Sequence, residues 1–338
     1  MSAKYILAFE SSCDDTSVAI LDTDYNILVN LISSQPEHLE FGGILPELAS
    51  RLHIKNIVTL TKSALLSSKL NLQDISAIAV SINPGLVGSL IVGLAFAKSI
   101  SWSLSLPLIT VNHLLSHIFA NFIEHQEITP PFLALVVSGG HTELAHFDTL
   151  TTFKVIGKTL DDAAGESFDK AAKLLGLGFP GGPVIDELAK NGNPNFIHFP
   201  RALPQKNNFN FSYSGLKTAI RTWLIKQNPD ALTQNMPDIA ASVQQAIIEP
   251  LVNKTVLCAK QHKIPYILLA GGVAANSALR RQLTESAAKY GIEVYYPSLA
   301  LCMDNAAMVA AAAIPKFLAG QYAPLSVNVS SLKGIRQV

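Results

Sequence analysis

The chain has 338 residues, of which 49% are hydrophobic, and its 25 basic and 25 acidic residues give a formal net charge of zero. This size and apolar content suffice for two domains with separate cores. Zero net charge excludes an overall basic field, so any polynucleotide must be held locally or through a partner. Three cysteines without a CxxC pair argue against a disulfide framework or a cysteine-bound zinc. The longest apolar run, 306–314, is shorter than the roughly 20 residues that a bilayer requires, and no basic, apolar leader precedes Glu10, so we expect a cytoplasmic protein.

The chain opens with a predicted hairpin, in which apolar strands at 6–9 and 18–21 flank a polar turn at 10–17. Serine and aspartate favour such turns, so turn formation alone could explain this composition. The turn also brings together Glu10, Asp14 and Asp15, and three carboxylates this close repel one another unless a cation or proton donor lies near. Both a structural and a charge-binding interpretation therefore remain open.

A buried strand followed by a glycine turn and a helix occurs twice. Strand 75–81 leads into the turn 84–88, and strand 266–270 leads into the turn 271–273. Such turns present the backbone N–H groups of a helix start to an anion. Asn276, just after the second turn, can direct its amide toward a nucleotide or can cap the following helix.

His113 and His117 have the spacing that places two side chains on one face of a helix. Asp304, which precedes an apolar stretch with the character of a helix, is a candidate third ligand. Two imidazoles and one carboxylate leave coordination positions open, as catalytic metal sites require. Taken alone, the pair fits one core or capping histidine and one exposed histidine equally well.

A second predicted hairpin consists of strands 132–137 and 144–147. Its turn contains Ser138, Gly139 and Gly140, and the absence of two Cβ atoms lets a ligand approach the backbone closely. Free N–H groups in such a turn suit a phosphate or another oxyanion. A simple hairpin loop is the alternative.

Two acidic residues accompany glycine-rich turns in the region that follows. Asp169 lies beside the apolar face of a predicted helix that includes Phe168, and Asp186 follows the turn 179–183. Carboxylates in this setting can accept hydrogen bonds from ribose hydroxyls. An acid in the first turns of a helix can also simply complement the helix dipole.

The hairpin and the strand, glycine turn and helix recur in the same order in both halves of the chain. We therefore expect an α/β protein with a duplicated lobe, the plan of the actin-like, sugar-kinase and Hsp70 ATPase superfamily with its RNase H-like topology. The predicted first lobe comprises 1–110 plus 305–338. The predicted second lobe comprises 111–304 and carries an insertion at about 157–240.

With these residues in place, nearly the whole chain resembles the TsaD (YgjD/Gcp) family of tRNA N6-adenosine threonylcarbamoyltransferases, formerly described as O-sialoglycoprotein endopeptidases. The motifs that carry the resemblance are Glu-Ser-Ser-Cys-Asp-Asp-Thr (10–16), Gly-Gly-Ile-Leu-Pro-Glu-Leu-Ala-Ser-Arg-Leu-His (42–53), Pro-Gly-Leu-Val-Gly-Ser-Leu (84–90), Asn-His-Leu-Leu-Ser-His (112–117), Val-Ser-Gly-Gly-His-Thr (137–142), Gly-Glu-Ser-Phe-Asp-Lys (165–170), Phe-Pro-Gly-Gly-Pro (179–183), Phe-Ser-Tyr-Ser-Gly-Leu-Lys (211–217), Ala-Gly-Gly-Val-Ala-Ala-Asn (270–276) and Met-Asp-Asn-Ala-Ala-Met (303–308). This number of motifs in the same order makes chance agreement negligible.

The resemblance implies that His113, His117 and Asp304 bind one divalent metal ion per subunit, either Fe²⁺ or Zn²⁺. It also implies that the adenylate substrate is bound by Val136, Val137, Ser138, Gly139, Gly140, Asp169, Gly182, Asp186 and Asn276. Asp14 is our candidate for orienting or deprotonating the attacking amine. The chain departs from the usual family pattern at Ser11, Asp15 and Met303, where the family has Thr, Glu and Thr.

The implied reaction transfers a threonylcarbamoyl group from threonylcarbamoyl-AMP to N6 of adenosine 37 in tRNAs that read ANN codons, forming N6-threonylcarbamoyladenosine (t6A). The implied partners are tRNA, a TsaB-type paralogue and a TsaE-type ATPase, with a TsaC-type synthase that supplies the adenylate. An isolated chain could also form a homodimer.

Two other functions compete with this interpretation. A zinc protease of the HExxH type needs a glutamate after its first histidine, and this chain has Leu114 there. A small-molecule kinase or ATPase of the same fold would use the repeated hairpins. Such an enzyme works with Mg²⁺ held by carboxylates and water and has little use for two histidines.

Overall fold

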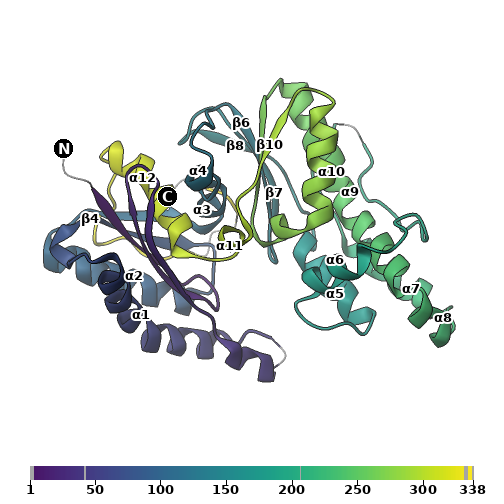
Figure 1. Ribbon diagram of the computed structural model, residues 1–338, viewed down its shortest axis with the longest axis horizontal. Helices are drawn as coiled ribbons and strands as arrows, with labels where there is room; N and C mark the ends of the chain where they lie inside the picture. The colour runs from purple at the N-terminus through teal and green to yellow at the C-terminus, as the bar shows by residue number, and fades with distance from the viewer. Residues whose placement is uncertain (1–3, 42, 206, 331–333, 337–338) are drawn as a thin grey trace. The chain divides into compact units, whose positions relative to one another are not determined.

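The computed structural model describes residues 4–41, 43–205, 207–330 and 334–336, which form two compact units (Figure 1). Unit 1 comprises Met1–Ile128 and Pro297–Val338, and unit 2 comprises Thr129–Tyr296. Unit 1 contains β1 (Tyr5–Glu10), β2 (Thr16–Asp22), β3 (Ile27–Ser33), η1 (Pro36–Phe41), α1 (Pro46–Ser68), η2 (Leu72–Asp74), β4 (Ile75–Asn83), α2 (Val87–Leu104), β5 (Leu108–Asn112), α3 (His113–Phe119), α4 (Asn121–Glu124), α11 (Leu299–Cys302) and α12 (Ala306–Leu318). Unit 2 contains β6 (Phe132–Val137), β7 (Thr142–Phe147), β8 (Phe153–Lys158), α5 (Ala164–Leu174), α6 (Gly181–Ala189), α7 (Ser214–Leu224), α8 (Pro229–Gln234), α9 (Met236–His262), β9 (Tyr266–Ala270), η3 (Gly272–Ala275), α10 (Ser277–Ala288) and β10 (Glu293–Tyr295).

Each unit is built on a five-stranded mixed sheet, and the two sheets have the same topology. The strand order is β3-β2-β1-β4-β5 in unit 1 and, read in the corresponding direction, β8-β7-β6-β9-β10 in unit 2. In each sheet the first three strands in sequence pair antiparallel, each with the next. The other two strands lie on the opposite side of the first strand and run parallel to it. The predicted duplication of an α/β lobe is therefore confirmed.

The sheet of unit 1 is covered on both faces, so its central strands are apolar throughout. In Figure 1, α1 and α2 lie on one face of this sheet and α12 lies on the other. Leu7 and Phe9 of β1 pack in one cluster with Ile57 of α1 and Leu94 of α2. The intervening side chains of β1 are equally buried, as expected for a sheet between two helical layers.

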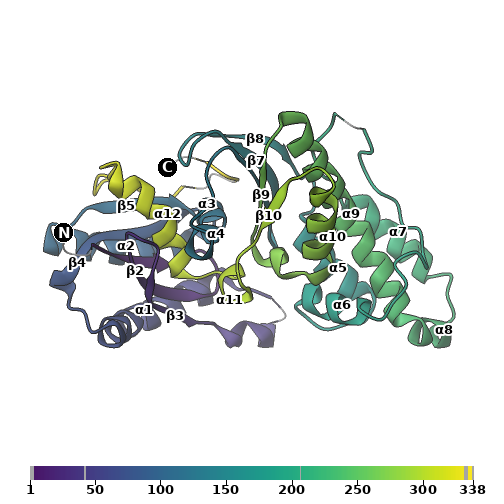
Figure 2. The same cartoon turned by 45° about the horizontal axis from the view of Figure 1, so that its top comes forward.

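Unit 2 has additional helices between its third and fourth strands. Figure 2 shows α9 and α10 side by side next to β9 and β10. In the chain, α9 lies between the third and fourth strands of its unit, as α1 does in unit 1. The helices α5 to α8, within residues 164–234, precede α9, and in the described part of unit 1 the short η1 is the helical segment at the corresponding point of the chain order. This region falls inside the range 157–240 where we expect an insertion.

The structure divides the chain at places other than the predicted boundaries of 110 and 305. The first unit continues to Ile128 and resumes at Pro297. Two contacts explain the difference: β5 completes the first sheet by pairing with β4, and α3 packs against α12. As a result His113, His117 and Asp304, which the predicted boundaries place in the second lobe, all belong to unit 1.

Among the described residues, one helix is long and apolar enough to cross a membrane by length and composition alone. This is α2, with 18 residues and a mean hydropathy of 1.5. The longest uninterrupted apolar run, 306–314, forms most of α12, but α2 is the longer apolar helix. Because core helices of folded domains meet the same test, and α2 packs against β4 and α1, this is weak evidence for a membrane span.

Candidate functional site

The two histidines lie on α3, directly after the edge strand β5. Asn112 ends the strand and caps the helix, because its side-chain oxygen accepts hydrogen bonds from the N–H groups of Leu114 and Leu115 (3.0 and 3.1 Å). The helix begins at His113, so the four-residue spacing brings the two imidazole rings together with a centroid distance of 4.7 Å. The predicted shared helix face is confirmed.

Asp304 lies between α11 and α12 and directs its carboxylate at both histidines. Its Oδ1 lies 3.1 Å from Nε2 of His117 and 3.5 Å from Nε2 of His113. The potential ligand atoms of the three residues all lie within 4.8 Å of one another. The structure thus brings together the three residues proposed as metal ligands.

A fourth residue, Glu10, contacts His113 at the ring nitrogen that faces away from Asp304. Its fully buried carboxylate lies 3.2 Å from Nδ1 of His113, and it accepts hydrogen bonds from Oγ of Ser81 (2.5 Å) and the N–H of Ser12 (2.6 Å). Since an ionised carboxylate can only accept, Nδ1 of His113 carries a proton and donates it to Glu10, which turns Nε2 of the ring toward Asp304. This is the arrangement in which an outer carboxylate orients a metal-binding histidine.

The electrostatics of the cluster favour positive charge between the carboxylates. Burial lowers the pKa of His113, but Asp304 and Glu10 outweigh burial and raise that pKa to about 9. Burial likewise raises the pKa values of Glu10 and Asp304, yet the neighbouring histidines hold both below their usual range. Two imidazole nitrogens and a carboxylate oxygen that favour a cation in this way fit a divalent metal with open coordination positions.

The turn between β1 and β2 faces the same centre. Burial is the largest cause that raises the pKa values of Cys13 and Asp15, and the negative charges of Asp14 and then Asp304 add to it. Asp14 is partly buried in this turn next to Cys13. His53 of α1 fixes the turn through Oγ1 of Thr16 (2.8 Å) and the carbonyl oxygen of Cys13 (2.9 Å).

The glycine turn of the second hairpin is open in unit 2. A Cβ atom at Gly139 or Gly140 would meet nothing within 4 Å. In the described part of the chain neither glycine donates a backbone hydrogen bond, whereas the carbonyl groups of Ser138 and Gly139 accept from the start of α5 (3.2 and 3.1 Å). The turn is thus anchored by its carbonyl groups and keeps its N–H groups available.

Val136 and Val137, predicted with this turn as substrate contacts, have fully buried side chains in β6. The strand pairs with β7 and β9 on either side. Gly271 has φ +89° at the end of β9, and a Cβ there would lie 2.5 Å from the carbonyl oxygen of Val137. Both glycine turns of unit 2 therefore lie at one edge of the sheet, where parallel strands end.

Asp169 and Gly182 lie where α5 meets α6. One carboxylate oxygen of Asp169 accepts a hydrogen bond from the N–H of Gly181 (2.8 Å), and burial raises the pKa of this group. A Cβ at Gly181 would lie 2.6 Å from that of Ala172, whereas one at Gly182 would meet nothing within 4 Å. Gly181 thus serves helix packing, and the backbone of Gly182 stays accessible.

Asp186 lines a pocket of about 310 Å³ between α6, α9 and α10. Its carboxylate accepts hydrogen bonds from the N–H and the hydroxyl of Ser277 (3.0 and 2.9 Å). Asn276 caps α10 by accepting from the N–H of Leu279 (2.8 Å) and donates to Gln244 (2.7 Å), which also lines the pocket. Of the two alternatives for Asn276, the structure shows the capping role, and the side chain is buried.

Several residues of these sites were missed by the sequence analysis. Glu10 had a signal, since its turn concentrates negative charge, but its partner His113 is 103 positions away. Gln244 also had one, as a polar residue in the apolar middle of α9. The sequence around Ser277 and Asn112 shows only that each could cap a helix, and it does not indicate their contacts in these sites.

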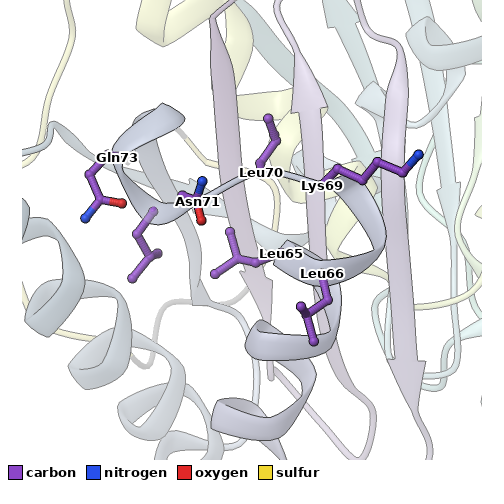
Figure 3. Close-up of a pocket in the computed structure, with 7 residues that line it drawn as sticks. Leu65, Leu66, Lys69, Leu70, Asn71 and Gln73 are labelled. Carbon is purple, nitrogen blue, oxygen red and sulfur yellow. The ribbon is translucent and has the colours of Figure 1, made fainter.

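A further surface pocket, of about 480 Å³, lies at the end of α1 (Figure 3). Its lining residues are Leu65, Leu66, Lys69, Leu70, Asn71, Leu72 and Gln73. None of the predicted site residues is among them, so this pocket is separate from the candidate sites.

Fold and site together define a class of protein: a duplicated α/β chain with a cluster of two histidines and one carboxylate in one unit, and with a glycine turn and a polar pocket in the other. A family model described as tRNA N6-adenosine threonylcarbamoyltransferase (TsaD) matches residues 26–311. The chain is 48% identical to the protein of that name from Moorella thermoacetica over 96% of this chain and 95% of that protein. It is 45% identical to the one from Clostridioides difficile over 98% and 99%. The chain belongs to the TsaD family.

Solved structures of low sequence identity share the fold. The full-length HypF in its phosphate- and nucleotide-bound form aligns with a TM-score of 0.62 at 15% identity, over 95% of this chain and 56% of that one. Component A of (R)-2-hydroxyglutaryl-CoA dehydratase from Acidaminococcus fermentans aligns with a TM-score of 0.55 at 15% identity, over 93% and 98%. These likenesses support the predicted actin-like, two-lobe ATPase fold.

Family membership settles the broad function. The curated relatives are transferases that form N6-threonylcarbamoyladenosine in tRNA, so the chain is a tRNA-modifying enzyme with tRNA as substrate. The prediction of a transferase is confirmed, and neither a kinase nor an endopeptidase is favoured.

Proposed function

We propose that the chain takes its acyl group from threonylcarbamoyl-AMP and transfers it to N6 of adenosine 37 in tRNAs that read ANN codons. In this reaction the N6 amine forms a new bond to the carbamoyl carbon and loses a proton. The bond from that carbon to the phosphate oxygen breaks, and AMP leaves. One combination of features in unit 2 supports an adenylate donor. The turn of Gly139 and Gly140 has free N–H groups, and a pocket in the same unit is lined by Asp186.

The residues of unit 2 would bind the AMP part of the donor. The N–H groups of Gly139 and Gly140 suit the phosphate, whose negative charge grows as AMP leaves. Asp186 uses part of its acceptor capacity for Ser277 and keeps lone pairs for ribose hydroxyls. Asp169, Gly182 and Asn276 complete the proposed contacts.

His113, His117 and Asp304 would hold one divalent metal ion, Fe²⁺ or Zn²⁺. When bound, such an ion supplies Lewis-acid polarisation of the carbonyl or phosphate oxygen of the donor. The two imidazole nitrogens and one carboxylate oxygen suit both metals. Glu10 would fix the orientation of His113, and Asp14, which is partly buried in the turn after β1, would orient the attacking amine or accept its proton.

The proposed partners are a TsaB-type paralogue and a TsaE-type ATPase, with a TsaC-type synthase as the source of the adenylate. Because the chain has a net charge of zero and no overall basic field, we expect it to bind tRNA together with these partners. Apolar side chains exposed on α1 (Ile54, Val58) and α2 (Val87, Ile91) support a protein interface on these helices, used by the paralogue or by a second copy of the chain. Such a reaction belongs in the cytoplasm, where unmodified tRNA and ATP are available.

The test is reconstitution with these partners, unmodified tRNA, threonine, bicarbonate and ATP, followed by mass spectrometry of nucleosides. We expect t6A with the wild-type chain and a loss of about 100-fold or more with His117→Asn. His146→Asn is the matched control, because His146 pairs only loosely with Asp148 (3.9 Å) outside the site. Absence of t6A with all components verified as active would refute the proposal, and elemental analysis of the purified protein would identify the metal.

A further inference from the structure

The segment after α12 returns to the metal-binding helix of unit 1. Its described residues, 321–330 and 334–336, are called the carboxy-terminal tail below. The tail runs along the parallel side of the sheet, where the N–H of Ala323 donates to the carbonyl of Leu108 (2.8 Å) and the N–H of Ser330 donates to that of Ile82 (3.2 Å). Ile335 near its end is only 4% exposed. These contacts fix the tail to β4 and β5, the strands that lead to the site.

Two buried asparagines join the tail to α3. Asn83 and Asn112 are paired residues at the ends of β4 and β5. The amide of Asn112 donates to Oδ1 of Asn83 (2.8 Å) and to the carbonyl oxygen of Gly334 (3.0 Å). The amide of Asn83 donates in turn to Oγ of Ser330 (2.8 Å). The tail therefore supplies two of the groups that hold this pair.

The hydrogen bonds of Asn112 leave little freedom to the helix that follows. Its oxygen accepts two bonds from the first turn of α3, and its amide makes two further bonds, so all four strong hydrogen-bonding positions of the side chain are used. His113 is the next residue in the chain. A rotation of the Asn112 side chain would thus change the direction in which α3 leaves the sheet, and with it the position of both imidazoles.

We propose that Asn112 is a positioning residue for the metal centre and that the carboxy-terminal tail sets its orientation. This inference rests on the proposed metal centre. The tail touches none of the metal ligands through any of these bonds, and it acts through the cap of α3. Loss of the tail contact should weaken metal binding even though every ligand remains. Outer residues that orient metal ligands typically contribute about 10- to 100-fold to affinity.

Asn112→Asp separates this role from ordinary helix capping. Aspartate keeps the oxygen that caps α3 and is as good an N-cap as asparagine, but it cannot donate to Asn83 or Gly334. Its added negative charge would by itself attract a cation, so a loss of affinity could not arise from simple electrostatics. Ser330→Ala and Ile335→Asp weaken the same connection from the side of the tail.

The experiment titrates the full-length, metal-free protein with Co²⁺ and records its visible ligand-field spectrum. We expect the dissociation constant to rise about 10-fold or more for Asn112→Asp and about threefold or more for the two tail variants. Asn71→Ala, which removes a cap of η2 in the same unit, should leave the constant unchanged. Because binding and ordering are reciprocal, Co²⁺ should also slow amide exchange in residues 323–330 of the wild-type protein and do so less in Asn112→Asp.

Equal Co²⁺ affinity and identical spectra for wild type, Asn112→Asp and both tail variants would overturn the inference and leave the metal centre intact. If the wild-type protein does not bind Co²⁺, the metal centre and this inference both fail. Thermal unfolding by circular dichroism identifies folded variants. Should Asn112→Asp not fold, Ser330→Ala and Ile335→Asp decide the matter.

Discussion

Glu10 shows how a buried acid can orient one of the proposed metal ligands without belonging to the ligand set itself. Its carboxylate has three hydrogen-bond donors around it, from Ser12, Ser81 and His113. These donors compensate for the loss of solvation that burial imposes on a charge. The residue keeps a proton on Nδ1 of His113 and so orients Nε2 of that ring toward Asp304.

Asp14 differs from Glu10 because it is only partly buried and is therefore accessible to a substrate. If it accepts the proton of the attacking amine, Asp14→Asn should lower the single-turnover rate of t6A formation by about 10²- to 10⁴-fold at saturating adenylate. Asp24→Asn, at an exposed position of the next turn, is the control. An undiminished rate for Asp14→Asn would show that this carboxylate has no catalytic part.

Lys316 of α12 gives a prediction about stability. Its ammonium donates to the carbonyl oxygen of Thr110 (2.9 Å), yet burial lowers its pKa to about 8 from the ordinary value of 10.5. Between these two values the unfolded chain binds more protons than the folded one, so the free energy of unfolding should rise with pH. In Lys316→Met this contribution should be missing.

The measurement is urea unfolding of wild type and Lys316→Met from pH 7 to pH 10. The stability of the wild type relative to the variant should increase over this window by the order of 2 kcal/mol, after allowance for partial solvent screening. A constant difference across the window would mean that Lys316 keeps an ordinary pKa.

At the scale of elements, several helices of this chain begin directly after an asparagine whose side-chain oxygen accepts from their first N–H groups. Asn112, Asn276 and Asn305 cap α3, α10 and α12 from the preceding position. The start of α7 is different, because Tyr213 cannot cap it. Asp161, more than fifty residues earlier, accepts from the N–H groups of Tyr213 and Ser214 (2.7 and 3.3 Å) and from two serine hydroxyls.

These bonds outweigh burial and lower the pKa of Asp161. We expect Asp161→Ala to reduce the free energy of unfolding by about 1–2 kcal/mol at neutral pH. The loss should shrink as acid protonates the carboxylate of the wild type. Amide exchange at the start of α7 should accelerate. Asp162→Ala, which removes only an ion pair with Lys170 (2.7 Å), should cost less than about 1 kcal/mol, and equal losses for both variants would contradict the capping role.

Elements were more predictable than the contacts between them. Strand periodicity and glycine turns predicted both hairpins, because these signals are local. The pairing of His117 with Asp304 spans 187 positions, so the sequence could offer Asp304 only as a candidate third ligand and could not show the contact itself. The boundary at residue 110 was misplaced because β5 is a short buried strand, and nothing in its sequence shows which sheet it joins.

At the scale of the whole molecule, the two copies of the lobe differ in how the chain forms them. Unit 2 is one continuous segment, whereas unit 1 combines the first and last parts of the chain. A fragment comprising Thr129–Tyr296 should therefore fold alone, show a cooperative thermal transition and bind AMP at the pocket of Asp186. It should bind no stoichiometric Co²⁺, since it lacks His113, His117 and Asp304.

Isothermal titration of the fragment and the full chain with AMP and with Co²⁺ tests this division. A fragment that binds AMP with the affinity of the full chain would place the nucleotide contacts within unit 2. Stoichiometric Co²⁺ binding by a folded fragment would contradict the assignment of the metal ligands.

The position of α12 also determines when the enzyme can mature during synthesis. This helix covers one face of the first sheet, and Asp304 precedes it directly. While the ribosome makes residues 129–296, strands β1 and β2 have already emerged but lack the helix that covers them. The continuous second unit can fold first. The proposed metal site can form only after Asp304 has emerged, because a chain that stops before this residue lacks one of the three proposed ligands.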